Sequence, residues 1–181
     1  MNQSIRIVAL FATLFFGQCS ELAAQTASDA VYDAAVESAP NDCPIVVADH
    51  TEIEGIDSKT SIAYAESLNL DASVGRAFAA ANMTPQSIVW SPREKVVRLV
   101  TKPERLDKTS PDMLLKIRGE HPCVAYLYSF SAVGLSPSAT EAMVKVNRHC
   151  NALCGAGSDI LYLRLLDGKW KIVRWRPLWI N

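Results

Sequence analysis

Four of the five cysteines and one histidine are the residue types best suited to chemistry in this chain of 181 residues. Cys150 and Cys154 are separated by three residues, and Cys123 follows His121 by two positions. Thiolate and imidazole groups are ligands that zinc prefers, so His121, Cys123, Cys150 and Cys154 form one candidate metal set. The same thiols are candidates for a thiol-dependent reaction, which would need an activating base beside the sulfur.

The geometry of a strand argues against a catalytic pair made by His149 and Cys150. These residues are adjacent in an apolar, β-rich segment, and adjacent strand residues point to opposite faces of a sheet. The chain also contains no HExxH motif, no nucleophile elbow and no paired-carboxylate constellation. These absences favour a protein without catalytic activity, and we expect no cofactor.

The first 24 residues have the pattern of a signal peptide. A short segment with one positive charge precedes an apolar run from Ile7 to Gly17, and Ala24 provides a small residue at the cleavage position. We expect cleavage after Ala24 and a periplasmic or secreted protein, with residues 25–181 forming one domain. Lipidation at Cys19 is not expected, because Gln18 is unfavourable immediately before a lipidated cysteine.

Export determines how the remaining cysteines are interpreted. An even number of thiols in an oxidising compartment predicts structural disulfides, here from Cys43, Cys123, Cys150 and Cys154. The favoured pairing joins Cys43 to Cys123 and Cys150 to Cys154, and the other two pairings stay open. The net charge of −1 gives no reason to expect a nucleic-acid partner, and no segment predicts a membrane span in the mature chain.

The elements that must position these residues are helices early in the chain and strands late. Residues 28–39 form either a short helix or part of a mobile leader that covers residues 25–42, and Asp71–Asn82 has a helical apolar period. Strands are expected at residues 45–48, 88–90, 96–100 and 123–130. The prediction is a single α+β domain with an antiparallel meander in its C-terminal half and helices packed on one face.

The C-terminal hairpin is the most specific local prediction. Asp167-Gly168 suits a two-residue turn, which pairs Leu165 with Trp170 and Leu166 with Lys169. Alternation then assigns one face to the core, namely Leu161, Leu163, Leu165, Trp170 and Ile172. In the preceding strand it directs Ala142, Val144 and Val146 inward and Glu141, Lys145, Asn147 and His149 outward.

Two candidate binding regions follow from this alternation. The second face of the hairpin carries Tyr162, Val173 and Trp175, which are either covered by the Asp71–Asn82 helix or exposed as a binding surface. We favour the covered arrangement. A pocket between that helix and the sheet would be lined by Phe78, Tyr126, Tyr128 and Trp170.

Several spaced motifs of the last third of the chain resemble those of a group of small exported bacterial proteins. The motifs are Ser131-x-Val-Gly-Leu-Ser136, Ala142-x-Val-x-Val146, Cys150-x3-Cys154-Gly-x-Gly157, Asp167-Gly-x-Trp-x-Ile172 and Trp179-Ile-Asn181. The resemblance implies no activity or site residues. The closing hairpin is also loosely similar to that of cystatin-like and nuclear-transport-factor-2-like folds. Cys-x3-Cys with a distant histidine resembles the ligand set of exported copper chaperones, but Gly155 stands where those have proline.

The sequence therefore favours a non-catalytic, disulfide-stabilised binding module of the bacterial envelope. Its expected partner is a protein or another envelope component of unknown identity, contacted through the sheet. The alternative is a periplasmic protein that binds zinc or copper, or uses a thiol, at the Cys150 and Cys154 cluster.

Overall fold

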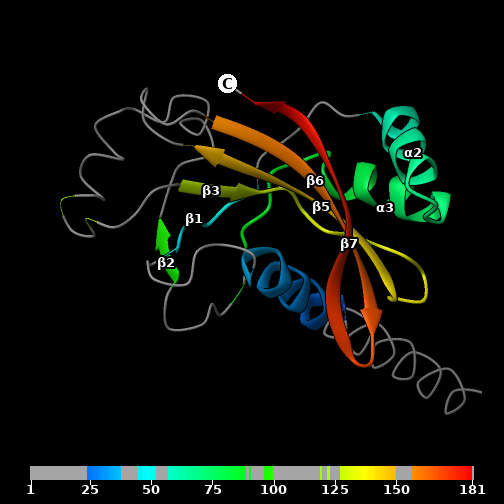
Figure 1. The fold of residues 1–181 in the computed structure, drawn as a ribbon, viewed down its shortest axis with the longest axis horizontal. Helices are drawn as coiled ribbons and strands as arrows, with labels where there is room; N and C mark the ends of the chain where they lie inside the picture. Colours follow the sequence, from blue (N-terminus) through cyan, green and yellow to red (C-terminus); the bar gives the residue numbers. More distant parts are fainter. Residues whose placement is uncertain are drawn as a thin grey trace, which may run out of the picture.

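The β-strands of the computed structural model join into one mixed sheet (Figure 1). The structure describes residues 24–37, 45–51, 57–88, 90, 96–99, 119, 122, 127–149 and 156–180. The strands are β1 (Ile45–Ala48), β2 (Val96–Leu99), β3 (Leu127–Phe130), β4 (Gly134–Leu135), β5 (Glu141–His149), β6 (Ala156–Leu166) and β7 (Lys169–Ile180). Their order is β2-β1-β3-β5-β6-β7, and β4 pairs with β5.

Pairing in the sheet is antiparallel late in the chain and parallel early. The strands β5, β6 and β7 form the predicted meander, and β3 pairs antiparallel with β5. In contrast, β1 lies parallel to both β2 and β3. Of the strand expected at residues 88–90, the structure describes Ile88 and Trp90, which are buried but belong to no strand.

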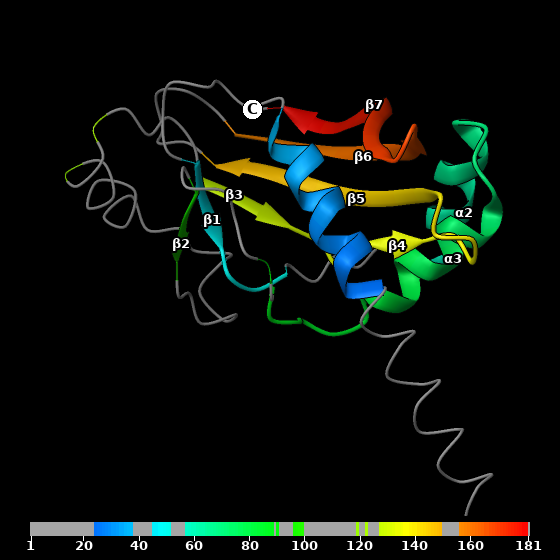
Figure 2. The same ribbon diagram turned by 90° about the horizontal axis from the view of Figure 1, so that it is seen from below.

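The first helix, described over residues 24–37, covers one face of the sheet. Figure 2 shows it in blue, crossing obliquely in front of the strands. Its residues Val31, Tyr32 and Ala35 are buried in one cluster with β-strand residues, which include Phe130, Val144, Leu163 and Trp170. The hydroxyl of Tyr32 donates a hydrogen bond to the carbonyl oxygen of Ser131 at 3.0 Å. Residues 28–37 are therefore helical, as the first of the two alternatives for this segment predicted, and are not part of a mobile leader.

Two further helices cover the opposite face. In α2 (Ser58–Ser67) and α3 (Ala72–Ala81), each N-cap aspartate accepts a hydrogen bond from a backbone N–H of the first turn. Val74 and Phe78 of α3 pack against Met143, Ile160 and Tyr162, as the predicted Asp71–Asn82 helix requires. The α+β fold is confirmed, but the helices lie on both faces rather than one, because neighbouring residues of β5 belong to two different clusters.

Close backbone contacts fix the position of α3. A Cβ atom added at Gly75 would lie 2.5 Å from the carbonyl oxygen of Ser61 in α2. One added at Gly134 in β4 would lie 2.4 Å from the backbone nitrogen of Phe78. Asn82 reinforces this arrangement, because its buried side chain bonds to both the N–H and the carbonyl oxygen of Ala132.

Burial on both faces of β5 corrects one sequence prediction. Ala142, Val144 and Val146 are buried, as predicted, but Lys145 and Asn147 are also buried, at 2% and 3% exposure. Alternation along the strand assigns them to the face opposite Ala142, Val144 and Val146, which was predicted to be the solvent face. A central strand between β3 and β6 has no solvent face where both sides of the sheet are covered.

The β6–β7 hairpin has the predicted turn and register. Leu165 pairs with Trp170 and Leu166 with Lys169, and Asp167 and Gly168 both have positive φ, as a two-residue turn of this type requires. Leu161, Leu163 and Trp170 are buried, Ile172 is partly buried and Leu165 is 37% exposed. Farther from the turn, the register shifts twice, between Tyr162 and Leu163 and between Ser158 and Asp159.

Candidate binding surface

The predicted metal and disulfide residues lie outside the described residues. This applies to His121, Cys43, Cys123, Cys150 and Cys154, and the side chain of His149 is not described either. In the described part of the chain, no group of three or more His, Cys, Asp or Glu side chains could hold a metal ion. The disulfides and the metal set therefore stay predictions.

The structure does not bring the predicted pocket residues together. Phe78 packs with the α2–α3 cluster on one face, whereas Trp170 and Tyr128 belong to the cluster under the first helix on the other face. Tyr126 lies outside the described residues. The sheet separates Phe78 from Trp170, so these side chains do not line one pocket.

The predicted binding surface is divided between the two faces. Tyr162 is fully buried against the α2–α3 cluster and Val173 packs at its edge, so the covered arrangement describes them. Trp175, in contrast, is 61% exposed. The register shift explains this division: Leu163 pairs with Ile172 but Tyr162 pairs with Arg174, so Val173 is an extra residue. Trp175 consequently pairs with Leu161 and lies on the face opposite Tyr162.

Burial also makes the Tyr162 hydroxyl harder to ionise. Burial raises the pKa of its hydroxyl well above the usual value, and the nearby Arg176 guanidinium opposes this shift. Among the described residues, the hydroxyl has no hydrogen-bond partner. Tyr162 is therefore a core residue and not an accessible contact residue.

The exposed side chains of β7 combine tryptophan with positive charge. We call them the β7 surface, which consists of Lys169, Lys171, Arg174, Trp175, Arg176 and Trp179. Residues 169–180 contain four basic residues and no acidic residue. In the sheet that the structure describes, β7 is the last strand and pairs only with β6. Arg174 and Arg176 pair with Tyr162 and Ile160 on the α2–α3 face, whereas Trp175 lies on the opposite face. This edge therefore presents positive charge on one face and exposed aromatic area on the other.

The basic side chains of the β7 surface differ in how firmly they are held. The Arg176 guanidinium lies over the Tyr64 ring, 4.6 Å from its centroid, and contacts the Ser67 hydroxyl at 3.4 Å. Lys169, Lys171 and Arg174 form no ion pair with any described residue. Within the described part of the chain, three of the four positive charges therefore lack a compensating acid.

Several features of β7 oppose main-chain pairing with another strand. Pro177 lacks an N–H group, the two register shifts distort the edge, and lysine side chains flank it. Natural sheets use these features to prevent edge-to-edge association. A partner at this edge is thus expected to contact side chains and not to extend the sheet.

Sequence reasoning found Trp175 but assigned it to the wrong face, and it missed Arg174 and Trp179. The density of Trp, Lys and Arg in residues 169–179 was the available signal, whereas no glycine or proline marks the extra residue Val173. None of the described helices has the length and apolar character of a membrane span. Comparisons with protein-family models, with curated proteins and with solved structures found no match to this chain.

Proposed function

We propose that this chain is a non-catalytic binding module that holds an acidic segment of a partner protein on the β7 surface. The observation that carries the proposal is the exposure of Trp175 and Trp179, at 61% and 39%, on an edge strand that carries four basic residues and no acidic residue. The N-terminal sequence supports export, so the proposed partner belongs to the envelope or the exterior. The resemblance to small exported bacterial proteins supports the same location.

The residue types of the β7 surface are those that contribute most to protein interfaces. Tryptophan and arginine are enriched among residues whose truncation costs the most binding energy. Trp175 supplies a large apolar area on one face of this edge strand, and Arg174 and Arg176 on the other face supply donors for carboxylates. Uncompensated positive charge favours an acidic partner and disfavours a basic one.

The proposal is tested by titrating the purified chain with a synthetic peptide of alternating Glu and Leu, measured by calorimetry. We expect binding that weakens as salt concentration rises, since exposed charges are screened at high ionic strength. The change Trp175→Ser should weaken binding about tenfold or more, the range of interface hot spots. Met83→Ser is the matched control, because Met83 is 78% exposed but lies in the turn after α3.

Two results would contradict the proposal. A peptide of alternating Lys and Leu that binds as tightly would show that charge does not select the partner. Equal losses in Trp175→Ser and Met83→Ser would show that the β7 surface is not the contact.

A further inference from the structure

A small cleft lies on the α2–α3 side of the hairpin, on the face opposite Trp175. It has a volume of about 280 Å³ and is lined by Leu68, Asn69, Arg164, Val173 and Arg174. Leu68 and Asn69 belong to the turn that joins α2 to α3, and the other three residues belong to β6 and β7. Two guanidinium groups and an amide therefore meet two apolar side chains in one depression.

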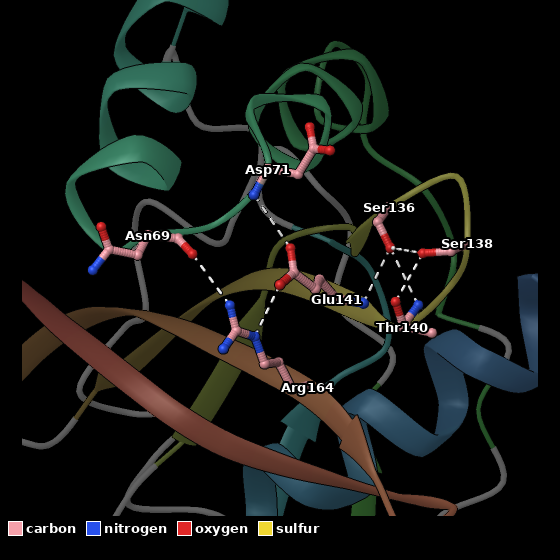
Figure 3. A network of polar contacts seen from close by, with 7 residues as sticks. All are labelled: Asn69, Asp71, Ser136, Ser138, Thr140, Glu141 and Arg164. Carbon is pink, nitrogen blue, oxygen red and sulfur yellow. Dashed lines mark hydrogen bonds and ion pairs between the residues drawn. The ribbon is translucent and has the colours of Figure 1, made fainter.

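Arg164 is held in place by a polar network, shown in Figure 3. Its Nε donates to Glu141 Oε1 at 2.9 Å, and one of its terminal nitrogens donates to the carbonyl oxygen of Asn69 at 3.1 Å. The second carboxylate oxygen of Glu141 accepts from the backbone N–H of Asp71 at 3.2 Å. The network joins the α2–α3 turn to the sheet, and Glu141 compensates the charge of Arg164.

The start of β5 is fixed by a second group of contacts in the same figure. The hydroxyl of Ser136 accepts hydrogen bonds from the backbone N–H groups of Thr140 and Glu141, at 3.2 and 3.1 Å (Figure 3). The hydroxyl of Ser138 lies between those of Ser136 and Thr140. Because these bonds position the backbone of Glu141, they also support the orientation of Arg164.

Arg174 supplies the uncompensated charge of the cleft. The extra residue Val173 places Arg174 opposite Tyr162. Tyr162 is two positions from Arg164 in β6, so Arg174 and Arg164 lie on the same face of the sheet. Arg174 is exposed and forms no ion pair with any described residue. Thus a fixed, neutralised arginine and a free arginine line the same cleft.

We infer that this cleft binds a small organic monocarboxylate. A single uncompensated guanidinium matches the single charge of a carboxylate and forms two parallel hydrogen bonds to it. Leu68 and Val173 provide an apolar wall for a short hydrocarbon chain. The cleft is smaller than the roughly 300–1,000 Å³ of pockets for drug-sized ligands, so a ligand of a few carbon atoms fits best.

Arg174 belongs both to the cleft and to the β7 surface, but the inference does not depend on the β7 surface as a protein contact. The cleft needs neither Trp175 nor Trp179, and its ligand is a small molecule rather than a polypeptide. The change Trp175→Ser should therefore leave carboxylate binding unchanged while it weakens binding of the acidic peptide. Failure of one proposal is distinguishable from failure of the other.

The test is a titration of the isotope-labelled chain with sodium hexanoate, followed by amide chemical shifts. We expect saturable shifts at Leu68, Asn69 and Val173, and none with hexylamine, which has the same tail and the opposite charge. Arg174→Gln should weaken binding about tenfold or more, as loss of hydrogen bonds to a charged group predicts. The affinity of Arg174→Lys should lie between those of the wild type and Arg174→Gln. The control is Arg76→Gln, which changes an exposed arginine of α3 and should bind hexanoate as the wild type does.

Three outcomes would overturn the inference. One is tighter binding of inorganic phosphate than of hexanoate, which would indicate a site for inorganic anions. The second is hexanoate-induced shifts confined to residues outside the cleft, or no saturable shifts. The third is equal affinity of the wild type and Arg174→Gln for hexanoate. If a variant fails to fold, the chemical shifts of the wild type alone still show whether hexanoate binds in the cleft.

Discussion

The contact between β4 and α3 predicts a large loss of stability in the variant Gly134→Ala. The added Cβ would lie 2.4, 2.5 and 2.6 Å from the N, Cα and Cβ atoms of Phe78. Carbon atoms normally approach to about 3.5–4.0 Å, so the helix and the strand must separate by about 1 Å. The nearest obstructing atoms are backbone, and a change of side-chain rotamer cannot remove the overlap.

The expected cost follows from what α3 loses when it moves. Val74 and Phe78 are fully buried against the sheet, and separation opens their contacts with Met143. Overpacking typically costs about 1–3 kcal/mol, and we expect about 3 kcal/mol because backbone must shift. With a urea dependence of about 2 kcal/mol per M, the unfolding midpoint should fall by about 1.5 M.

Urea unfolding followed by tryptophan fluorescence measures this change, because Trp90 is almost fully buried. Gly119→Ala is the matched control, since a Cβ added there meets no atom within 4 Å. Its midpoint should stay close to that of the wild type. The reasoning is refuted if Gly134→Ala unfolds at the same urea concentration as Gly119→Ala. It is also refuted if Phe78→Leu restores the stability of Gly134→Ala, because the first obstruction is the backbone of residue 78.

Three further predictions concern buried polar groups and the cysteines. Burial and the charge of Asp29 raise the pKa of Tyr32, so stability is retained below about pH 10 and falls as pH rises above it, when only the unfolded chain loses the proton. Tyr32→Phe should cost about 1 kcal/mol at neutral pH and make the alkaline loss shallower, by up to about 1.4 kcal/mol per pH unit; an unchanged slope would contradict this. Asn82→Ala should lower the free energy of unfolding in urea by about 3 kcal/mol, because it leaves the buried N–H and carbonyl oxygen of Ala132 without their partner. The control Gln86→Ala removes an exposed amide that bonds to the end of α3, and it should cost less than about 0.5 kcal/mol. Finally, the intact mass of the exported chain should correspond to two disulfides and resist alkylation; bound zinc or copper, or two alkylatable thiols, would instead favour the metal or thiol alternative.

Local patterns in the sequence predicted the elements whose structure is decided locally. The apolar period of Asp71–Asn82 specified α3, and Asp167-Gly168 specified the hairpin and its register near the turn. Both signals act over a few residues, so distant parts of the chain were not needed to interpret them.

Features decided by distant contacts were not predictable in the same way. Nothing within residues 45–48 indicates that β1 pairs in parallel with two strands from later in the chain. The burial of Lys145 and Asn147 depends on what covers the second face of β5, which polarity alone does not reveal. The face of the sheet on which Trp175 lies depends on the extra residue Val173, and a strict alternation of faces along the strand does not allow for an extra residue.

The parallel position of β1 has a consequence for the order in which the chain folds. The meander of β5, β6 and β7 closes short loops, whereas the bonds from β1 to β2 and β3 close loops of tens of residues. Loop-closure entropy makes such pairing slow relative to a hairpin. We therefore expect the C-terminal meander to form first and β1 to dock late. Until it docks, the edge of β3 is open to other chains, so dilute conditions should favour refolding over aggregation.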